Sequence, residues 1–154
     1  MMRRLGLFAL VVAISLSASA QQKTAASKFD KTIMQTVWDA WCTLDPANPA
    51  KYYDKNKADI FYDIAPLQYH GWSEYEVGVK PVLAQWKSGK CKVNYDGTVR
   101  QESPTMAWTS STVNLDAVKQ DGSPDKMIFR WTAIWHKHGS QWLITHEHVS
   151  VPAQ

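Results

Sequence analysis

Asp63 is the carboxylate in this sequence that is best placed to act as a general base. It follows Phe61 and Tyr62 at the end of a short strand-like run, so we expect it at the mouth of an apolar pocket. Burial there would raise its pKa towards values useful for taking a proton near neutral pH. The alternative is a loop aspartate that caps a turn beside Pro66. The residues alone do not separate these two interpretations.

A second group of polar side chains lies on the last two strand-like segments. His146 and His148 share a face if the strand is regular, and Arg130 and Thr132 join that face if the hairpin loop has an odd length. Such a group could bind a carboxylate or polarise a carbonyl, with His148 as a catalytic candidate. The alternative is a structural network on the outer face of the sheet. Glu147, of opposite parity, is a further acid–base candidate, and a single bulge would exchange the two sets.

No established metal or cofactor motif is present. His136 and His138 form one H-x-H pair and His146 and His148 another, but the pairs run away from each other along the hairpin, so we expect no metal site. The sequence also lacks a glycine-rich phosphate loop, a G-x-S-x-G elbow and a paired CxxC. We therefore expect chemistry without a cofactor.

The first 20 residues have the pattern of a secretory signal peptide. Arg3 and Arg4 precede an apolar run, and Ala18-Ser19-Ala20 offers small residues where a signal peptidase cleaves. The run is too short to span a membrane, which needs roughly 20 apolar residues. We expect an exported, periplasmic or extracellular domain over residues 21–154, with no membrane association after cleavage. Losing the two arginines lowers the net charge from +3 to +1, which argues against a nucleic-acid partner.

The tryptophans suggest a ligand pocket. The two cysteines leave open whether a disulfide forms. The sequence has eight tryptophans, and large rings often line ligand pockets as well as cores. We expect Trp38, Trp41 and Trp108 to contact a small, largely apolar ligand together with Tyr62. Cys42 and Cys91 could pair in an oxidising compartment, but the sequence does not show whether they are close enough.

Helical and strand patterns occupy different halves of the chain. Helices are expected over 29–44, behind a capping box that starts at Ser27, over 50–57, and over 73–88 with a break at Gly78 and Pro81. A short strand is expected over 59–62, and four long strands over 92–100, 106–118, 126–136 and 142–151. This order predicts an α+β fold. Because neither face of the last two strands is plainly polar, we also expect a homodimer through the sheet.

The C-terminal hairpin resembles that of SnoaL-like proteins. The matching residues are Phe129-Arg130-x-Thr132 and Gly139-x-x-Trp142-x-Ile144-x-His146-Glu147-His148-x-Ser150-Val151-Pro152. These proteins belong to the nuclear-transport-factor-2-like superfamily, which includes ketosteroid isomerases. The resemblance implies a cone-shaped, cystatin-like fold, in which a curved antiparallel sheet wraps on the helices around an internal pocket.

The same resemblance implies roles for single residues. Asp63 matches the general base of the isomerases, and their pattern would point Thr145, Glu147 and Val149 inward. Two isomerase features are missing: the first helix has no tyrosine, and the strand position near Thr132 has no acid. Two hypotheses follow. One is a cofactor-free isomerase, dehydratase or cyclase that uses Asp63; the other is a non-catalytic dimeric module that binds a ligand or another protein.

Overall fold

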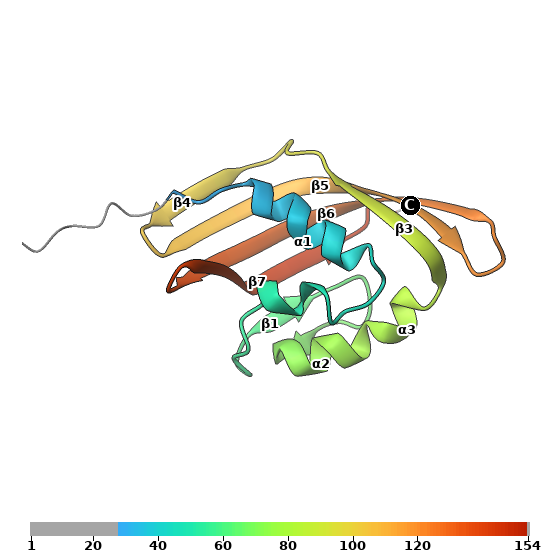
Figure 1. Ribbon diagram of the computed structural model, residues 1–154, viewed down its shortest axis with the longest axis horizontal. Coiled ribbons are helices and arrows are strands. Elements are labelled where there is room, and N and C mark those ends of the chain that lie inside the picture. The colour runs from blue at the N-terminus through green and yellow to red at the C-terminus, as the bar shows by residue number, and fades with distance from the viewer. Residues whose placement is uncertain (1–27, 154) are drawn as a thin grey trace, which may run out of the picture.

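The computed structural model describes residues 28–153, and the predicted signal peptide lies outside them. One curved sheet of seven strands makes up most of the domain (Figure 1). Its order is β2–β1–β7–β6–β5–β3, and β4 also pairs with β5. The strands are β1 (Ile60–Tyr62), β2 (Tyr69–His70), β3 (Trp86–Val93), β4 (Val99–Ser103), β5 (Met106–Lys119), β6 (Pro124–His138) and β7 (Gln141–Ser150). Every pair is antiparallel except β1 with β7, which is parallel.

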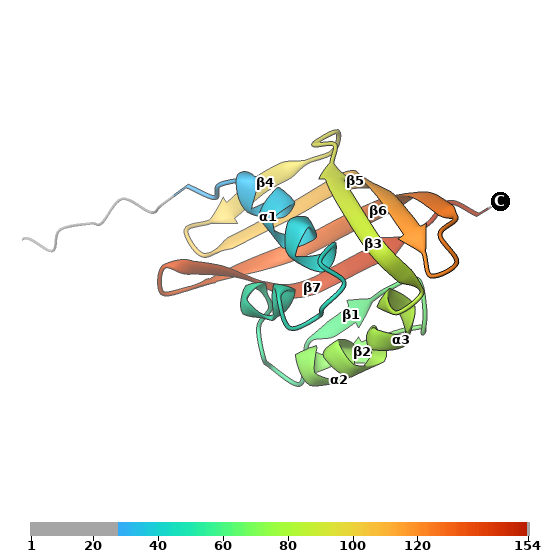
Figure 2. The same cartoon turned by 45° about the vertical axis from the view of Figure 1, so that its right-hand side comes forward.

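Four short helices complete the α+β fold. They are α1 (Thr32–Trp41), the 3₁₀ helix η1 (Pro49–Tyr52), α2 (Gly71–Gly78) and α3 (Lys80–Leu83). Figure 2 shows α1 lying across the concave side of the sheet, with α2 and α3 beside β1 and β2. The expected fold class is confirmed.

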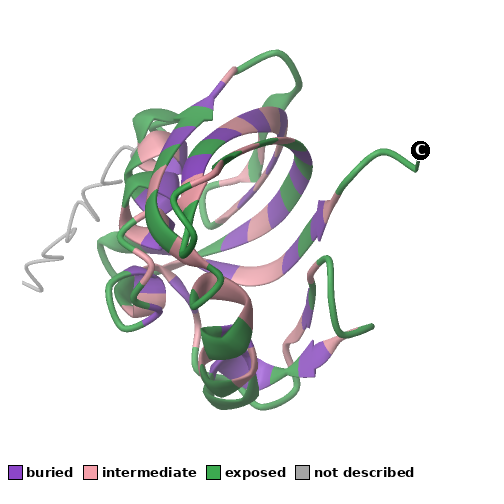
Figure 3. Ribbon diagram, turned by 90° about the vertical axis from the view of Figure 1, so that its right-hand side faces the viewer, coloured by how far each residue is buried: buried purple, intermediate pink, exposed green. Residues whose placement is uncertain are grey.

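Alternating burial along the long strands divides the sheet into an inner and an outer face. The buried residues of β6 are Phe129, Trp131, Ala133 and Trp135, and every residue between them is partly or fully exposed. Figure 3 shows this alternation as stripes along the curved strands. The inner face packs against α1, whose Met34, Val37, Trp38 and Trp41 are buried. The hydrophobic core therefore lies between α1 and the concave face.

A β-bulge in β7 decides which of its side chains point inward. Ile134 pairs with His146, but the next residue, Trp135, pairs with Ile144, so Thr145 is an extra residue without a partner. Trp142 and Ile144 are buried before the bulge, and Glu147 and Val149 after it. The bulge thus reverses the alternation and places Glu147 on the inner face.

Several predicted boundaries are wrong for local reasons. The first helix begins at Thr32, where the Asp30 side chain accepts a hydrogen bond from the Thr32 amide at 2.9 Å. The helix expected over 73–88 is split as predicted, but it ends at Leu83, because Trp86 already begins β3. The strand expected over 92–100 is two strands. Gly97 makes the connection possible, because a Cβ there would lie 2.4 Å from the Ser110 carbonyl oxygen.

A disulfide between Cys42 and Cys91 joins the end of α1 to β3, with their Cα atoms 5.9 Å apart. Gln35 connects the same two elements. Its amide nitrogen donates to the Cys91 carbonyl at 3.0 Å, and its oxygen accepts from the Val93 amide at 2.8 Å. The pairing that the sequence left open is therefore formed, and it fixes α1 against the sheet edge.

We predict that the double variant Cys42→Ser/Cys91→Ser is less stable than the oxidised protein by about 2–4 kcal/mol, because it loses a cross-link that closes a long loop. Denaturant unfolding measures the difference. The wild-type protein unfolded with and without reductant is the matched control, and reductant should leave the double variant unchanged. Equal stability of the oxidised protein and the double variant would contradict the prediction.

Candidate functional site

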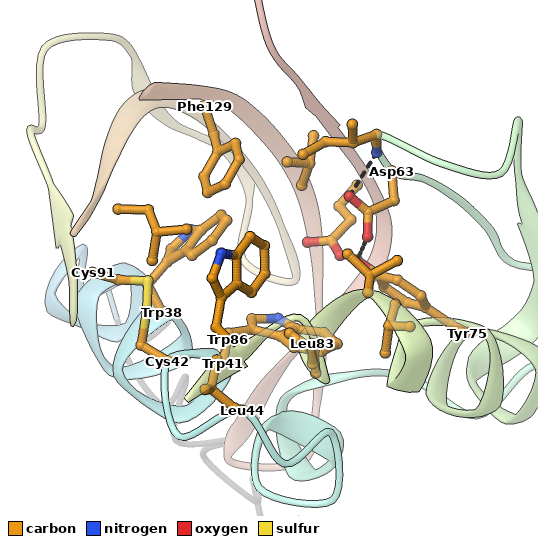
Figure 4. Close-up of a pocket in the computed structure, with 16 residues that line it drawn as sticks. Trp38, Trp41, Cys42, Leu44, Asp63, Tyr75, Leu83, Trp86, Cys91 and Phe129 are labelled. Atoms are coloured by element: carbon orange, nitrogen blue, oxygen red, sulfur yellow. Dashed lines mark hydrogen bonds between the residues drawn. A yellow bond between two sulfur atoms is a disulfide. The ribbon is translucent and has the colours of Figure 1, made fainter. Parts of the chain in front are cut away.

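A pocket opens between α1, β1, α2, α3 and the inner face of the sheet. Its cavity volume is about 70 Å³, and it opens to solvent. The wall is apolar and aromatic except for two carboxyl groups, Asp63 and Glu147, and none of its residues is a lysine, arginine or histidine. The lining residues are Trp38, Trp41, Cys42, Leu44, Asp63, Ile64, Tyr75, Val79, Val82, Leu83, Trp86, Cys91, Leu115, Phe129, Glu147 and Val149 (Figure 4). All the formal charge of the pocket wall is therefore negative.

Glu147 is a buried acid held by neutral donors. It is 1% exposed. The Tyr53 hydroxyl lies 2.9 Å from both carboxyl oxygens, and the Trp131 indole nitrogen donates to Oε2 at 2.9 Å. Burial raises the pKa of Glu147 to about 7, against the hydrogen bonds that lower it. At neutral pH this side chain is thus present both as an acid and as a carboxylate.

Tyr53, at the end of η1, is itself held in place. Its hydroxyl accepts a hydrogen bond from the Trp41 indole nitrogen at 2.8 Å, and its ring packs on Trp72 with centroids 4.5 Å apart. Burial, together with the nearby Glu147, raises the pKa of Tyr53 well above 10. The hydroxyl therefore stays protonated and acts as a fixed donor.

Asp63 follows β1 and faces the same pocket. Its Oδ1 accepts a hydrogen bond from the Ile64 amide at 2.7 Å, and the Tyr75 hydroxyl donates to Oδ2 across a longer 3.4 Å. Burial raises the pKa of Asp63, and these two hydrogen bonds oppose it. Compared with Glu147, Asp63 has fewer donors and is less deeply buried.

Tyr75, on α2, connects the two acids. Its ring stacks between Phe61 and Tyr69, with centroid distances of 5.3 and 4.9 Å. Its hydroxyl donates to Asp63 Oδ2 and also lies near enough to the Glu147 carboxyl to affect the pKa of both groups. Two acids in unlike environments thus share one hydroxyl, an arrangement that suits proton transfer in which one acid gives and the other takes.

The domain model for SnoaL-like proteins matches residues 31–154. The chain belongs to the SnoaL-like family. The resemblance of the C-terminal hairpin is therefore confirmed over most of the chain. Comparison with curated proteins finds no match.

Solved structures show the same fold at low sequence identity. A nuclear transport factor 2-like superfamily protein from Salmonella enterica serovar Typhimurium has a TM-score of 0.67 and 17% identity, over 80% of this chain and 91% of that chain. A candidate scytalone dehydratase from Novosphingobium aromaticivorans has a TM-score of 0.66 and 14% identity, over 79% and 82%. A hexachlorocyclohexane dehydrochlorinase has a TM-score of 0.63 and 8% identity, over 79% and 84%.

The SnoaL-like pocket contains only some of the residues expected from the sequence. Asp63, Glu147, Trp38 and Trp41 line it, and so do both cysteines. Six others do not line it: Tyr62, Trp108, Arg130, Thr132, His146 and His148.

The register explains this difference. Tyr62, His148 and Thr132 lie side by side on neighbouring strands, and all three are exposed. His148 joins Tyr62 and Thr132 on the outer face because the bulge at Thr145 turns its neighbour Glu147 inward. His148 and Arg130 therefore do not face this pocket, and the alternative, a polar group on the outer face, fits their placement.

Three residues of the site were missed by the sequence reasoning: Tyr53, Tyr75 and Trp131. Tyr53 and Tyr75 fall within the helices expected over 50–57 and 73–88, and nothing in those patterns marks either side chain as part of a site. Trp131 carried a usable signal, since it alternates with Ala133 and Trp135 on one face of β6. The contacts of all three with Glu147 join segments far apart in the chain.

Two further properties concern residues 28–153. No group of three or more histidine, cysteine, aspartate or glutamate side chains is arranged to hold a metal ion there. Within the same range, no helix combines the length and the apolar character that crossing a membrane requires.

We predict that Glu147 makes the folded protein less stable as the pH rises from about 4.5 to about 7. Because burial raises the folded pKa to about 7, above its ordinary value of 4.5, the folded state holds the proton that the unfolded state loses. The stability present below about pH 4.5 therefore falls by about 3 kcal/mol by pH 8. Denaturant unfolding of wild type and Glu147→Gln between pH 4 and 8 measures it. A difference between the two proteins that does not change with pH would contradict the prediction.

Proposed function

We propose that this SnoaL-like domain is a cofactor-free enzyme that moves a proton on a small, uncharged, largely apolar substrate carrying a carbonyl. The observation that carries the proposal is the pair Asp63 and Glu147. They are the two carboxyl groups in a largely apolar wall, and the Tyr75 hydroxyl lies beside both. Isomerisation and dehydration can both begin with removal of a proton from the carbon next to the carbonyl.

Asp63 is the better base of the pair. Its carboxylate has only one short hydrogen bond and lies nearer to solvent than Glu147, so a lone pair is free to take a proton. The proton comes from the carbon next to the substrate carbonyl, and the electron pair of that C–H bond moves into an enolate. The raised pKa of Asp63 makes its carboxylate a stronger base than an exposed aspartate.

Glu147 and Tyr75 are suited to stabilise the negative charge on the enolate oxygen by donating hydrogen bonds. A protonated Glu147 can donate a hydrogen bond to it, because its pKa near 7 leaves much of the acid form at neutral pH. In an isomerase, Asp63 then returns the proton to another carbon of the conjugated system. In a dehydratase, the bond to a β-hydroxyl breaks, and Glu147 gives its proton to the departing oxygen, which leaves as water.

The charge of the pocket restricts the substrate. Two acids and no basic residue in the wall disfavour a carboxylate or phosphate substrate, which would be buried beside like charges. The sequence alone allowed a ligand with either a carboxylate or a carbonyl. The charge of the pocket wall favours the carbonyl. Related folds named for dehydratase and dehydrochlorinase activity support elimination or isomerisation chemistry on this scaffold.

We predict that Asp63→Asn slows proton exchange at the activated carbon of 2-tetralone, an uncharged bicyclic ketone, at least about 100-fold. Nuclear magnetic resonance in deuterated water follows the exchange. Asp59→Asn is the matched control, because Asp59 also has a pKa raised by burial but does not line the pocket. Unchanged exchange in a folded Asp63→Asn protein would refute its role as the base.

The second candidate function is a dimeric binding module without turnover, and the outer face of the sheet favours a dimer. That face carries exposed apolar residues, Ile128 at 54% and Tyr62 at 37%, among polar ones such as Arg130 and His148. We propose that two copies associate through this face, whichever function the pocket has. A ligand that binds without exchange or turnover would favour the module.

We predict that Ile128→Lys weakens the dimer at least about tenfold, because a charge replaces an apolar side chain that association would bury. Sedimentation velocity at micromolar concentrations measures this. Val77→Lys is the control, since Val77 is an exposed apolar residue of α2, at 66%, away from the sheet. Equal association of both variants would contradict a dimer through the sheet.

Export is the last part of the proposal. It rests on the signal-like residues 1–20, and the Cys42–Cys91 disulfide supports it, because disulfides persist mainly in oxidising compartments. N-terminal sequencing of the protein recovered from the periplasm or the medium would test it, with cleavage after Ala20 as the expected result.

A further inference from the structure

The indole of Trp38, in the pocket wall, lacks within residues 28–153 the hydrogen bond that most other indoles in the domain make. Six of the eight tryptophans donate their indole hydrogen to a protein acceptor: Trp41 to Tyr53, Trp72 to Glu76, Trp86 to Asp125, Trp108 to Glu102, Trp131 to Glu147 and Trp135 to Thr109. The indole nitrogen of Trp38 is buried and has no hydrogen-bond partner among the described residues.

This unpaired donor belongs to the pocket. Trp38 lines it from α1, and its ring stacks on Phe129 with centroids 5.6 Å apart. It also meets the ring of Trp131 edge-on at 5.7 Å. Figure 4 shows Trp38 and Phe129 on one side of the pocket and Asp63 with Tyr75 on the other. Trp38 therefore lies across the pocket from Asp63 (Figure 4).

Leaving such a group unpaired costs the folded protein stability. A buried donor without an acceptor costs about 1–3 kcal/mol, and folded proteins contain few of them. The other buried, unpaired side-chain atom among the described residues, Asp59 Oδ2, does not belong to a residue of the pocket wall. The packing of Trp38 against two rings keeps its donor buried beside the pocket, out of reach of bulk water.

We propose that the Trp38 indole N–H binds an acceptor oxygen of the ligand, at the end of the molecule remote from the reacting carbon. Binding requires the ring to turn about its second side-chain torsion, which is broad in aromatic residues, until the nitrogen faces the pocket. The assignment of the reacting end rests on the function proposed above, but the binding role of Trp38 does not require turnover.

The ligand class follows from the two ends of the pocket. An indole nitrogen can only donate, so the remote group of the ligand must be an acceptor such as a ketone, ester or ether oxygen. The aromatic wall between the ends suits fused rings, and the acids exclude an anion. The ligand is thus an uncharged fused-ring molecule with a carbonyl at one end and an acceptor oxygen at the other.

The test compares two probes of nearly equal shape, 6-acetyl-2-tetralone and 6-isopropenyl-2-tetralone, of which only the first carries the remote acceptor. Calorimetric titration gives the ratio of their affinities. We expect Trp38→Phe to reduce the preference for the acetyl probe about three- to tenfold, the size of one neutral hydrogen bond. Trp86→Phe should keep the preference, because Trp86 also lines the pocket but already donates to Asp125 at 2.9 Å.

A second measurement does not depend on the folding of a variant. In the wild-type protein, the indole N–H resonance of Trp38 should move downfield with the acetyl probe and not with the isopropenyl probe. An unchanged preference in Trp38→Phe, or equal resonances with both probes, would overturn the proposal, and so would failure of both probes to bind at millimolar concentration. These readouts measure binding, so they remain informative if Asp63 proves not to be a base.

Discussion

The buried carboxyl group of Glu147 is the constraint on which the site depends. A buried acid is stable only when donors surround it or when it keeps its proton, and this protein uses both solutions. The donors come from η1 and β6, and the acid itself faces inward only because of the bulge in β7. Three separate segments of the chain therefore have to pack together to satisfy the Glu147 carboxyl group. Where they pack, they form the polar end of the pocket.

Aromatic packing holds these donors at fixed angles. Tyr53 lies against Trp41 and Trp72, and Tyr75 lies against Phe61 and Tyr69, so neither hydroxyl can turn away without disturbing several ring contacts. The rings that make up the core are thus also the supports of the site. Such support matters for proton transfer, because donors already in position need not reorganise when charge develops.

The sequence predicted the fold better than the site, for physical reasons. Long alternating strands and the hairpin residues around His146 indicate the sheet and the family, since both patterns are local. The strand end also singled out Asp63. The inward direction of Glu147 was not predictable from the residues alone, because one extra residue at Thr145 reverses the alternation. The donor Tyr53 could not be assigned, because it is separated from Glu147 by 94 positions, whereas the alternation of β6 gave a signal for Trp131.

The disulfide has a consequence for how the pocket can open. Residues 43–90 form a closed covalent ring with Cys42 and Cys91, and that ring carries Tyr53, Asp63 and Tyr75. A partial unfolding of this ring, of the kind that lets a ligand enter or leave a buried pocket, separates its two ends by no more than the bond allows. The cross-link removes part of the entropy that the loosened chain would otherwise gain, which favours its closing again onto α1 and the sheet. The cross-link thus limits how far this part of the pocket wall can move away from α1 and β3, besides its part in the stability of the domain.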